Sequence, residues 1–498
     1  MSRRRLARFV ICACLAHAIG CAGADALDVS DIQRAELDAL RSSERQGLEP
    51  ADYHLDRLDV LAQAHDEASV RRFSAALDSA FTRFAHDLAR GRLGPSVDPQ
   101  WHLEAEPDVS MPLPAFGSAG EVRAWLDRLV PTDPQYGGLL AVLGRYLDIA
   151  RQGGWPAVPA GADLRVGMRD ERVVALRNRL RISGHYTAEM GADPLYFDAG
   201  LDAALRRFQA EQGLWVDGTL EAKTLAALDV DVGRRIEQLK VTLERWRWLP
   251  RDFGARYVWI NIASQDMTVV EQGQSRLAMR VIVGRSYRQT PSLQGILNQV
   301  TFNPTWTVPF KLAIEDILPQ QRRNPQFLAS KQIRVFSTRD GREVDPAAID
   351  WSQLSRRNFG YQLRQDAGPQ NSLGHLKFSF DNPYDVYLHD TPTQILFKLP
   401  TRTFSAGCVR IENPLAFARY LFGIDRQLSP AEIDQAIAAG TTRTTRLQTG
   451  VPIYLVYLTA WVDTDASVHY RDDIYGRDVI VANAWRTATA RRAAEPLD

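Results

Sequence analysis

Cysteine is scarce in this 498-residue chain, which has four, and three of them (Cys12, Cys14 and Cys21) lie close to the N-terminus. Only Cys408 remains beyond that segment. A single cysteine has no partner for an intramolecular disulfide, so a structural disulfide is excluded for the rest of the chain. Cys408 is therefore either a buried inert thiol or a working nucleophile, and its neighbours must decide between them.

An excess of either charge is also lacking, because 60 Lys and Arg residues balance 60 Asp and Glu residues. This balance argues against a nucleic-acid-binding protein, which usually carries a basic excess. Long apolar runs are missing too, since the stretch Phe9 to Ala18 is shorter than the ~20 residues of a membrane span. The chain is 45% hydrophobic and 24% charged, as folded soluble proteins are, and its length predicts about three domains.

The N-terminus has the pattern of a secretory signal at residues 1–24. Arg3, Arg4, Arg5 and Arg8 precede the short apolar stretch, and Ala22-Gly23-Ala24 offers a cleavage site with small residues. Cleavage is the main prediction, with an uncleaved anchor or lipidation at Cys21 as alternatives. We therefore expect an exported protein of the periplasm that is either free or associated with the inner membrane.

The apolar spacing in the first half of the chain predicts helices. Apolar residues three and four positions apart, such as Phe73, Leu77 and Phe81, predict a helical scaffold domain at 27–152. After a Gly- and Pro-rich linker, three short apolar stripes predict a three-helix unit at 162–230. Its segment Phe208-Gln209 to Asp217-Gly218 resembles the peptidoglycan-binding domain family, whereas a generic helical spacer is the alternative.

From Tyr257 the apolar period changes to two, as in Val258, Ile260 and Ile262, which is typical of strands. We predict a mainly antiparallel β domain at 234–480 with an inserted lid or capping element at about 310–362. The tail at 484–498 shows no apolar period and is predicted to be disordered. The fold class is thus a multidomain α+β protein with a helical N-terminal domain, a small three-helix domain and a mainly antiparallel β domain that carries the insertion.

Cys408 lies in the segment Ser405-Ala406-Gly407-Cys408-Val409-Arg410, and its chemistry depends on a base. A thiolate is the reactive form of cysteine, and an imidazole raises its population. His389 ends a strand-like run in which Tyr387 shares its face, because residues two apart point the same way. Gly407 permits a tight turn with Ser405 beside it. On spacing alone, a structural thiol beside an unrelated histidine remains an equal alternative.

Further segments change that balance. Four of these segments are Tyr287-Arg288-Gln289-Thr290-Pro291, Asn303-Pro304-Thr305-Trp306, Asn371-Ser372-Leu373-Gly374 and Tyr387 to Pro392. Together with His389 and Ser405 to Arg410, they closely resemble the YkuD-type L,D-transpeptidase catalytic domains, over roughly residues 234–480. The order of the predicted domains resembles the long periplasmic branch of that family. One departure is Ala406, where many members have histidine, so this position supplies no second imidazole.

The resemblance implies a peptidoglycan L,D-transpeptidase that forms 3→3 cross-links between meso-diaminopimelate residues and releases D-alanine. Cys408 would form a thioester and His389 would transfer protons, with Gly407 and Ser405 completing the catalytic segment. Tyr387, Arg410, Trp306, Asn303 and Lys377 are the candidate substrate-binding residues. Trp306 and Asn303 have packing and turn formation as alternatives, and Lys377 and Arg410 have loop bracing.

No metal and no cofactor is implied, and the expected partners are donor and acceptor tetrapeptide stems of peptidoglycan, with other cell-wall synthesis proteins as further candidates. Two alternatives stay open. One is the same chemistry with water or a protein as acceptor, which would give an L,D-carboxypeptidase or a protein-to-peptidoglycan ligase. The other is a non-catalytic scaffold that binds the cell wall through residues 162–230.

Overall fold

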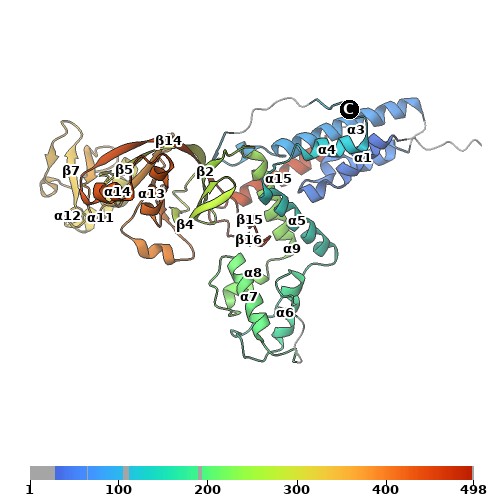
Figure 1. The fold of residues 1–498 in the computed structure, drawn as a ribbon, viewed down its shortest axis with the longest axis horizontal. Coiled ribbons are helices and arrows are strands. Elements are labelled where there is room, and N and C mark those ends of the chain that lie inside the picture. Colours follow the sequence, from blue (N-terminus) through green and yellow to red (C-terminus); the bar gives the residue numbers. More distant parts are fainter. Residues whose placement is uncertain (1–28, 64–65, 105–111, 189–192, 496–498) are drawn as a thin grey trace, which may run out of the picture.

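The computed structural model describes residues 29–63, 66–104, 112–188 and 193–495 (Figure 1). The predicted secretory signal at 1–24 lies outside the described residues. Figure 1 shows a helical region, a small helical unit below it and a β-rich region to the left. Within the described ranges, no helix combines the length and the apolar character that a membrane crossing requires.

The N-terminal region is helical, as predicted. The long helix α3 begins after Asp66, whose carboxylate accepts a hydrogen bond from Ser69 N and so caps the helix. Its apolar stripe, including Phe73, Leu77 and Phe81, is fully buried against the neighbouring helices. The helices are α1 (Asp31–Arg41), α2 (Leu55–Leu61), α3 (Glu67–Arg90), α4 (Ala119–Asp127) and α5 (Pro134–Arg151), with 3-10 turns at Ser43–Gln46, Pro50–Tyr53 and Pro95–Val97.

The predicted disorder of residues 484–498 is wrong for the part that the structure describes. Residues Arg477–Ala494 form helix α15, which returns to the N-terminal helices (Figure 1). Trp485 is buried in their core, and Arg492 pairs with Asp87 at 2.5 Å. No apolar period is visible in residues 484–498 because the end of α15 is held by charged partners about 400 positions earlier, which no local pattern can show.

The second helical unit contains α6 (Arg172–Ile182), α7 (Ala199–Glu211) and α8 (Ala222–Leu228). The predicted stripes converge on one core that includes Leu176, Leu205 and Phe208. Gln209 fixes the turn after α7, because its side-chain oxygen accepts hydrogen bonds from the N–H groups of Asp217 and Gly218 at 3.1 and 2.8 Å. A glutamine in the middle of this apolar stripe thus serves the turn.

The β-rich region is mainly antiparallel, as predicted, and follows the connecting helix α9 (Val232–Trp248). Its strands are β2 (Arg256–Asn261), β3 (Asp266–Glu271), β4 (Gln274–Gly284), β5 (Ser292–Phe302), β10 (Leu376–Phe380), β11 (Leu388–His389), β12 (Thr403–Ser405), β13 (Val409–Ile411) and β14 (Arg443–Val456). The strand order is β1-β5-β10-β11-β13-β4-β3-β2-β14, where β1 is Trp101–His102. Because β14 also pairs with β5, the sheet closes on itself.

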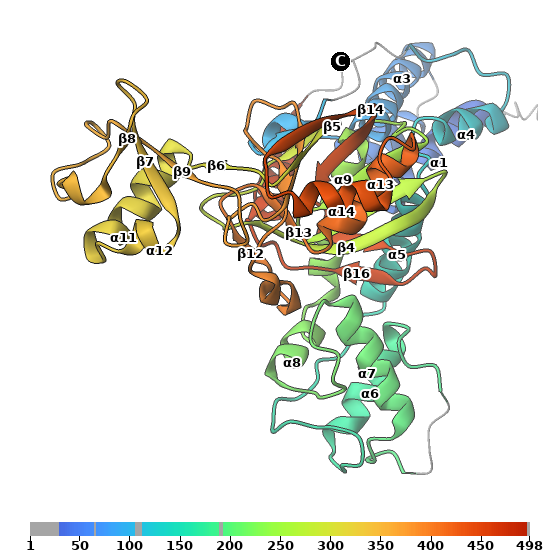
Figure 2. The ribbon, with the colours of Figure 1, turned by 60° about the vertical axis from the view of Figure 1, so that its left-hand side comes forward.

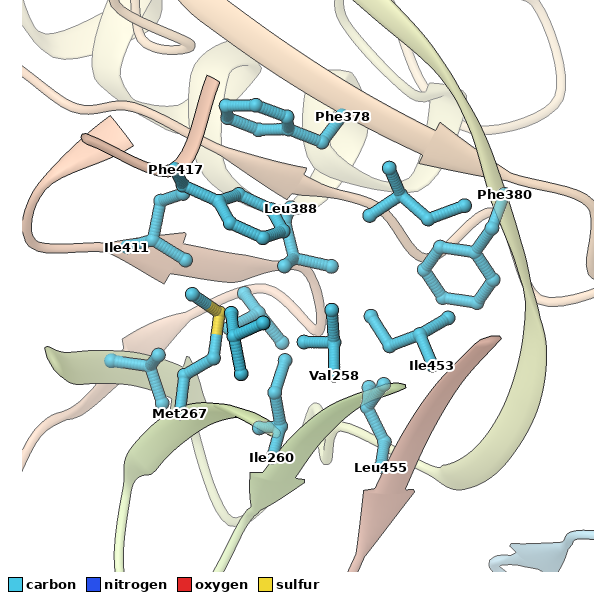
Figure 3. Packing of buried hydrophobic residues seen from close by; sticks show 14 of the residues in the cluster. Val258, Ile260, Met267, Phe378, Phe380, Leu388, Ile411, Phe417, Ile453 and Leu455 are labelled. Carbon is cyan, nitrogen blue, oxygen red and sulfur yellow. The ribbon is translucent and has the colours of Figure 1, made fainter. Parts of the chain in front are cut away.

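Alternating residues of these strands fill the interior of the closed sheet (Figure 3). Val258, Ile260 and Met267 meet Leu388 and Ile411 there, and all five are fully buried. Helices α13 (Pro414–Ile424) and α14 (Pro430–Ala438) cover this core, to which α13 contributes Phe417. The remaining elements are β15 (Ala460–Val462) and β16 (Val468–Tyr470), which form a hairpin, and a 3-10 turn at Gln394–Lys398.

The insertion forms a separate lobe with its own four-stranded sheet, ordered β6-β9-β7-β8. Figure 2 shows it projecting from the main sheet, to which it is joined through β6 and β9. Its core includes Leu328, Val335 and Leu363. Its elements are β6 (Trp306–Thr307), α10 (Phe310–Leu312), a π-helical turn (Ala313–Ile317), α11 (Leu318–Arg323), α12 (Phe327–Ser330), β7 (Ile333–Ser337), β8 (Glu343–Val344), a 3-10 turn (Pro346–Ala348) and β9 (Tyr361–Gln365). Its role as a lid stays a prediction.

Candidate active site

The register of β11 and β13 places the candidate residues on one face of the sheet. These strands are parallel and pair Leu388 with Val409 and His389 with Arg410. Leu388 and Val409 are completely buried in the core. Because side chains alternate along a strand, Tyr387, His389, Cys408 and Arg410 point to the opposite face. Lys377 joins them, since it pairs with His389 across β10 and β11.

The turn before Cys408 is held by side-chain hydrogen bonds. The Ser405 hydroxyl donates to the Cys408 carbonyl at 2.5 Å and accepts from Gly407 N at 3.1 Å. Gly407 has φ 124°, a conformation that side chains rarely tolerate, which explains why glycine stands there. The N–H of Gly407 is thus engaged within the turn by Ser405.

Thr290 is a supporting residue to which sequence reasoning assigned no role. Its hydroxyl donates to the Gly407 carbonyl at 2.7 Å and accepts from Gly284 N at 2.9 Å. The cysteine turn is thereby attached to the end of β4. The only sequence signal was the place of Thr290 in Tyr287-Arg288-Gln289-Thr290-Pro291, which precedes a strand and contains no residue type that points to this bridge.

The Cys408 thiol is half-buried and donates to the Asp385 carbonyl at 3.5 Å. Burial raises its pKa, whereas hydrogen bonds from the N–H and the hydroxyl of Tyr387 and the charge of Lys377 act in the opposite direction. The net effect is upward. The resting cysteine is therefore a neutral thiol with groups around it that stabilise the thiolate once it forms.

His389 is 5% exposed, and its orientation is fixed by one hydrogen bond. Its Nδ1 lies 2.5 Å from the backbone carbonyl oxygen of Asp390, which can only accept, so Nδ1 carries the proton and Nε2 keeps a free lone pair. Burial, with the nearby charges of Arg410 and Lys377, lowers the pKa of His389 to about 3 against the opposing effect of that carbonyl. The imidazole is neutral at physiological pH and can act as a base.

The side chain of Asp390 fixes the segment whose backbone carbonyl orients His389. The Asp390 carboxylate accepts hydrogen bonds from His375 N at 2.8 Å and Thr391 N at 2.7 Å. Gly374 leaves room for it, because a Cβ at that position would approach the carboxylate to 2.2 Å. Sequence reasoning did not identify Asp390 as the residue that orients the histidine, since a backbone carbonyl leaves no signature in the residue types.

Tyr387 connects several of the candidate residues. Its ring lies 5.7 Å from that of His389, and Lys377 Nζ lies 4.0 Å from its centre. Burial and the neighbouring Cys408 raise the pKa of its hydroxyl, whereas the neighbouring Trp306 acts in the opposite direction. The structure thus brings Trp306, on β6 at the start of the insertion, to the site that holds the cysteine.

Arg410 and Lys377 are cations with few partners. Burial lowers the pKa of both, an effect that the neighbouring Arg285 reinforces for Arg410. Among the described residues, Arg410 Nε is buried without a hydrogen-bond partner, and neither side chain forms a salt bridge. Uncompensated cations beside a nucleophile favour the binding of an anionic group.

Asn303 makes contacts that hold the fold together, and its assignment as a substrate-binding residue stays a prediction. It is buried, and its amide donates to the carbonyls of Ala436 and Ile437 at 3.0 Å each. Its side-chain oxygen lies 3.2 Å from Nδ1 of His375. These bonds cap the end of α14, so Asn303 stabilises the domain.

Comparison with family models assigns three parts of the chain. Residues 255–426 match the "L,D-transpeptidase catalytic domain" (YkuD), residues 27–143 match the "Scaffold domain", and residues 169–228 match the "Putative peptidoglycan binding domain". The catalytic match contains Lys377, Tyr387, His389 and Cys408, which lie together in the structure. It ends before β14.

A curated relative from Haemophilus influenzae, named "Putative L,D-transpeptidase", is 33% identical over 242 residues. The match covers 49% of this chain and 48% of that protein, so the chain spans about half the length of this relative.

Solved structures give weak overall superpositions. The L,D-transpeptidase of Xylanimonas cellulosilytica is 16% identical with a TM-score of 0.18, and covers 60% of this chain and 98% of its own. That of Stackebrandtia nassauensis is 14% identical with a TM-score of 0.21, and covers 60% and 96%. The family match and the curated relative identify residues 255–426 as an L,D-transpeptidase catalytic domain of the YkuD family, in a chain that also carries a peptidoglycan-binding domain.

Proposed function

We propose that this chain is a peptidoglycan L,D-transpeptidase of the periplasm that forms 3→3 cross-links through a thioester on Cys408. The observation that carries the proposal is the shared face of β11 and β13. There a cysteine turn stabilised by Ser405 faces the same side as His389, whose Nδ1 is bound to Asp390 and whose Nε2 is free. A nucleophile and a base with an orienting partner are the minimum that acyl transfer needs.

The first step is attack of Cys408 Sγ on the carbonyl carbon between meso-diaminopimelate and the terminal D-alanine of a tetrapeptide stem. His389 Nε2 accepts the thiol proton and becomes an imidazolium, the sulfur bonds to the carbonyl carbon, and the π electrons of the C=O bond move to the oxygen of a tetrahedral oxyanion. The Tyr387 hydroxyl and N–H lie beside the sulfur and stabilise the developing negative charge. The C–N bond then breaks, and the imidazolium gives its proton to the departing D-alanine nitrogen.

The second step transfers the acyl group. The side-chain amine of the diaminopimelate in a second stem attacks the thioester and loses a proton to His389 Nε2. The C–S bond breaks, and Cys408 recovers its proton from the histidine. The cross-linked product leaves, and the enzyme returns to its resting state with a neutral thiol and a neutral imidazole, as the pKa shifts of Cys408 and His389 require.

The substrate-binding residues follow from charge and position. Peptide stems carry carboxylates, and Arg410 and Lys377 are cations near Cys408 that form no salt bridge with any described residue. Trp306 lies beside Tyr387 where the insertion begins, so it would supply an apolar wall next to the reacting carbonyl. A peptidoglycan-binding domain at 169–228 would bring the same polymer to the catalytic domain, and the two domain matches support a location outside the cytoplasm.

The direct test uses purified tetrapeptide muropeptides as the only substrate. Our proposal predicts free D-alanine and a dimer whose mass and fragmentation show a 3→3 link, and Cys408→Ala should yield neither. Tripeptide monomers as the only product would show a carboxypeptidase. No reaction with any muropeptide would leave a cell-wall-binding scaffold and overturn the proposal.

A further inference from the structure

Strand β1 belongs to the N-terminal region and yet forms an edge of the catalytic sheet. It runs parallel to β5 and pairs Trp101 with Ser292 and His102 with Leu293. A hydrogen bond of 2.8 Å from Ser292 N to the Gln100 carbonyl continues this pairing. Arg477 braces the junction, since its guanidinium bonds to Asp98 and to the Ser292 hydroxyl at 3.0 Å. His102 is therefore fixed relative to the catalytic sheet.

The imidazole of His102 stacks on the ring of Tyr384, with centroids 4.3 Å apart and planes inclined by 20°. Tyr384 is otherwise 44% exposed and lies in the loop 381–387 between β10 and β11. Asn382 organises this loop, because its side-chain oxygen accepts from Tyr384 N and Val386 N at 3.1 Å each. The His102 ring, which lies outside the catalytic domain, therefore supports the exposed side of this loop through its contact with Tyr384.

The same loop ends at the Cys408 thiol. Asp385 has φ 54°, a left-handed conformation that costs a non-glycine residue of the order of 1–2 kcal/mol. Such a residue keeps its conformation only when the surrounding structure imposes it. This conformation directs the Asp385 carbonyl to Cys408, whose sulfur donates to it at 3.5 Å. The orientation of the thiol therefore depends on how firmly the loop is held.

We propose that His102 is a positioning residue of the active site: its ring holds Tyr384, and through the loop it holds the Asp385 carbonyl that orients the Cys408 thiol. A residue of the N-terminal region then controls the nucleophile of a catalytic domain from which it is separated by more than 100 positions. The inference rests on Cys408 as the nucleophile of the proposed function.

Two readouts on the intact chain test this role. The first is the rate at which a carbapenem acylates Cys408, followed by intact mass. The second is the pH profile of Cys408 alkylation by iodoacetamide, which needs no transpeptidase activity. His102→Ala should slow acylation about tenfold, because a misplacement of 1 Å costs about 100-fold and the loop should shift by less.

His102→Ala should also move the alkylation profile to lower pH. In the folded wild-type chain, burial and the charge of the Asp385 carboxylate both raise the pKa of the Cys408 thiol. In His102→Ala the thiol becomes better hydrated and moves away from that carboxylate, so its pKa should fall. The other groups that face it (Tyr387, Lys377, His389 and Arg410) remain in place. Alkylation at neutral pH should therefore become faster while acylation becomes slower, a combination that a simple loss of packing in the N-terminal region does not produce.

His102→Phe keeps a flat ring and should restore both readouts. The matched control is His469→Ala, which removes a histidine stacked on Trp461 at 5.1 Å in the β15–β16 hairpin and should change neither readout. Wild-type acylation and alkylation in His102→Ala, or a His102→Phe variant as slow as His102→Ala, would overturn the inference. If iodoacetamide alkylates the wild type but a carbapenem never acylates it, the proposed function fails. The positioning role of His102 is then still decided by whether the alkylation profile of His102→Ala differs from that of the wild type.

Discussion

Cys408 and His389 are both neutral in the resting protein, because burial raises the pKa of the thiol and lowers that of the imidazole to about 3. A preformed thiolate–imidazolium pair is therefore disfavoured. In the proposed mechanism, the proton moves to Nε2 only as the sulfur attacks, when substrate carboxylates and the polarised carbonyl have changed the local field. This state also limits reaction of the thiol with small electrophiles at neutral pH.

The buried histidine makes stability depend on pH. Its pKa lies near 6.5 in the unfolded chain and at about 3 in the folded chain, so the unfolded state binds more protons between these values. The stabilisation is fully present above pH 6.5 and is lost as the pH falls toward 3. From pH 6.5 to 5 we expect a loss of about 2 kcal/mol that His389→Gln does not show. Urea unfolding of both proteins at each pH measures it, and parallel curves would contradict the assignment.

Ser405 is a positioning residue of the cysteine turn. Ser405→Ala removes the hydroxyl that bonds to both Cys408 O and Gly407 N, which leaves buried polar groups unpaired at a cost of about 1–3 kcal/mol. We expect a lower melting temperature and slower acylation of Cys408. Ala406→Ser changes the adjacent exposed position and should leave both unchanged. Equal acylation rates in Ser405→Ala and wild type would show that the turn forms without this hydroxyl.

At the scale of elements, the pairing of β11 with β13 creates the site, and this is the part that the sequence could not supply. The shared face of Tyr387 and His389 follows from their spacing along one strand, and Cys408 follows from its neighbours. The parallel pairing that brings Cys408 beside that strand joins segments about 20 positions apart without a local pattern. The Asp390 carbonyl that orients His389 is backbone and leaves no trace in the residue types.

The ion pairs of helix α15 also join distant segments without a local sequence pattern. Two neighbouring arginines of this helix allow a matched pair of variants. Arg492 bonds to Asp87, which is completely buried, whereas Arg491 is 78% exposed. Arg492→Gln leaves Asp87 without this charge partner and should destabilise the protein by about 3 kcal/mol, as broken buried pairs do. Arg491→Gln should change the free energy of unfolding by less than about 0.5 kcal/mol. Chemical denaturation compares them, and equal effects would mean that α15 does not hold the N-terminal helices.

At the scale of the whole molecule, the catalytic domain shares a core with the N-terminal region. Trp101 and Leu143 pack with Trp246 of α9 and with Val456 and Leu458 at the end of β14. The helical unit at 169–228 instead has a core of its own. Domains that look separable in the sequence therefore differ in how far they depend on the rest of the chain.

This difference predicts the behaviour of two shortened chains. A fragment of residues 234–480 exposes the shared core and should aggregate or melt at least about 10 °C below the full chain. A chain from which residues 162–228 are removed keeps that core and should fold, with Cys408 still acylated by a carbapenem. Thermal unfolding and intact mass test both. A fragment 234–480 as stable as the full chain would show that the catalytic domain is autonomous.

The central claim is that Cys408 is an acyl-carrying nucleophile activated by His389. The most direct measurement is the intact mass of the full chain after incubation with a carbapenem, for wild type, Cys408→Ala and His389→Gln. Our account predicts one covalent adduct on wild type, none on Cys408→Ala, and a severely slowed reaction of His389→Gln. An unmodified wild type, or an adduct that persists in Cys408→Ala, would contradict it.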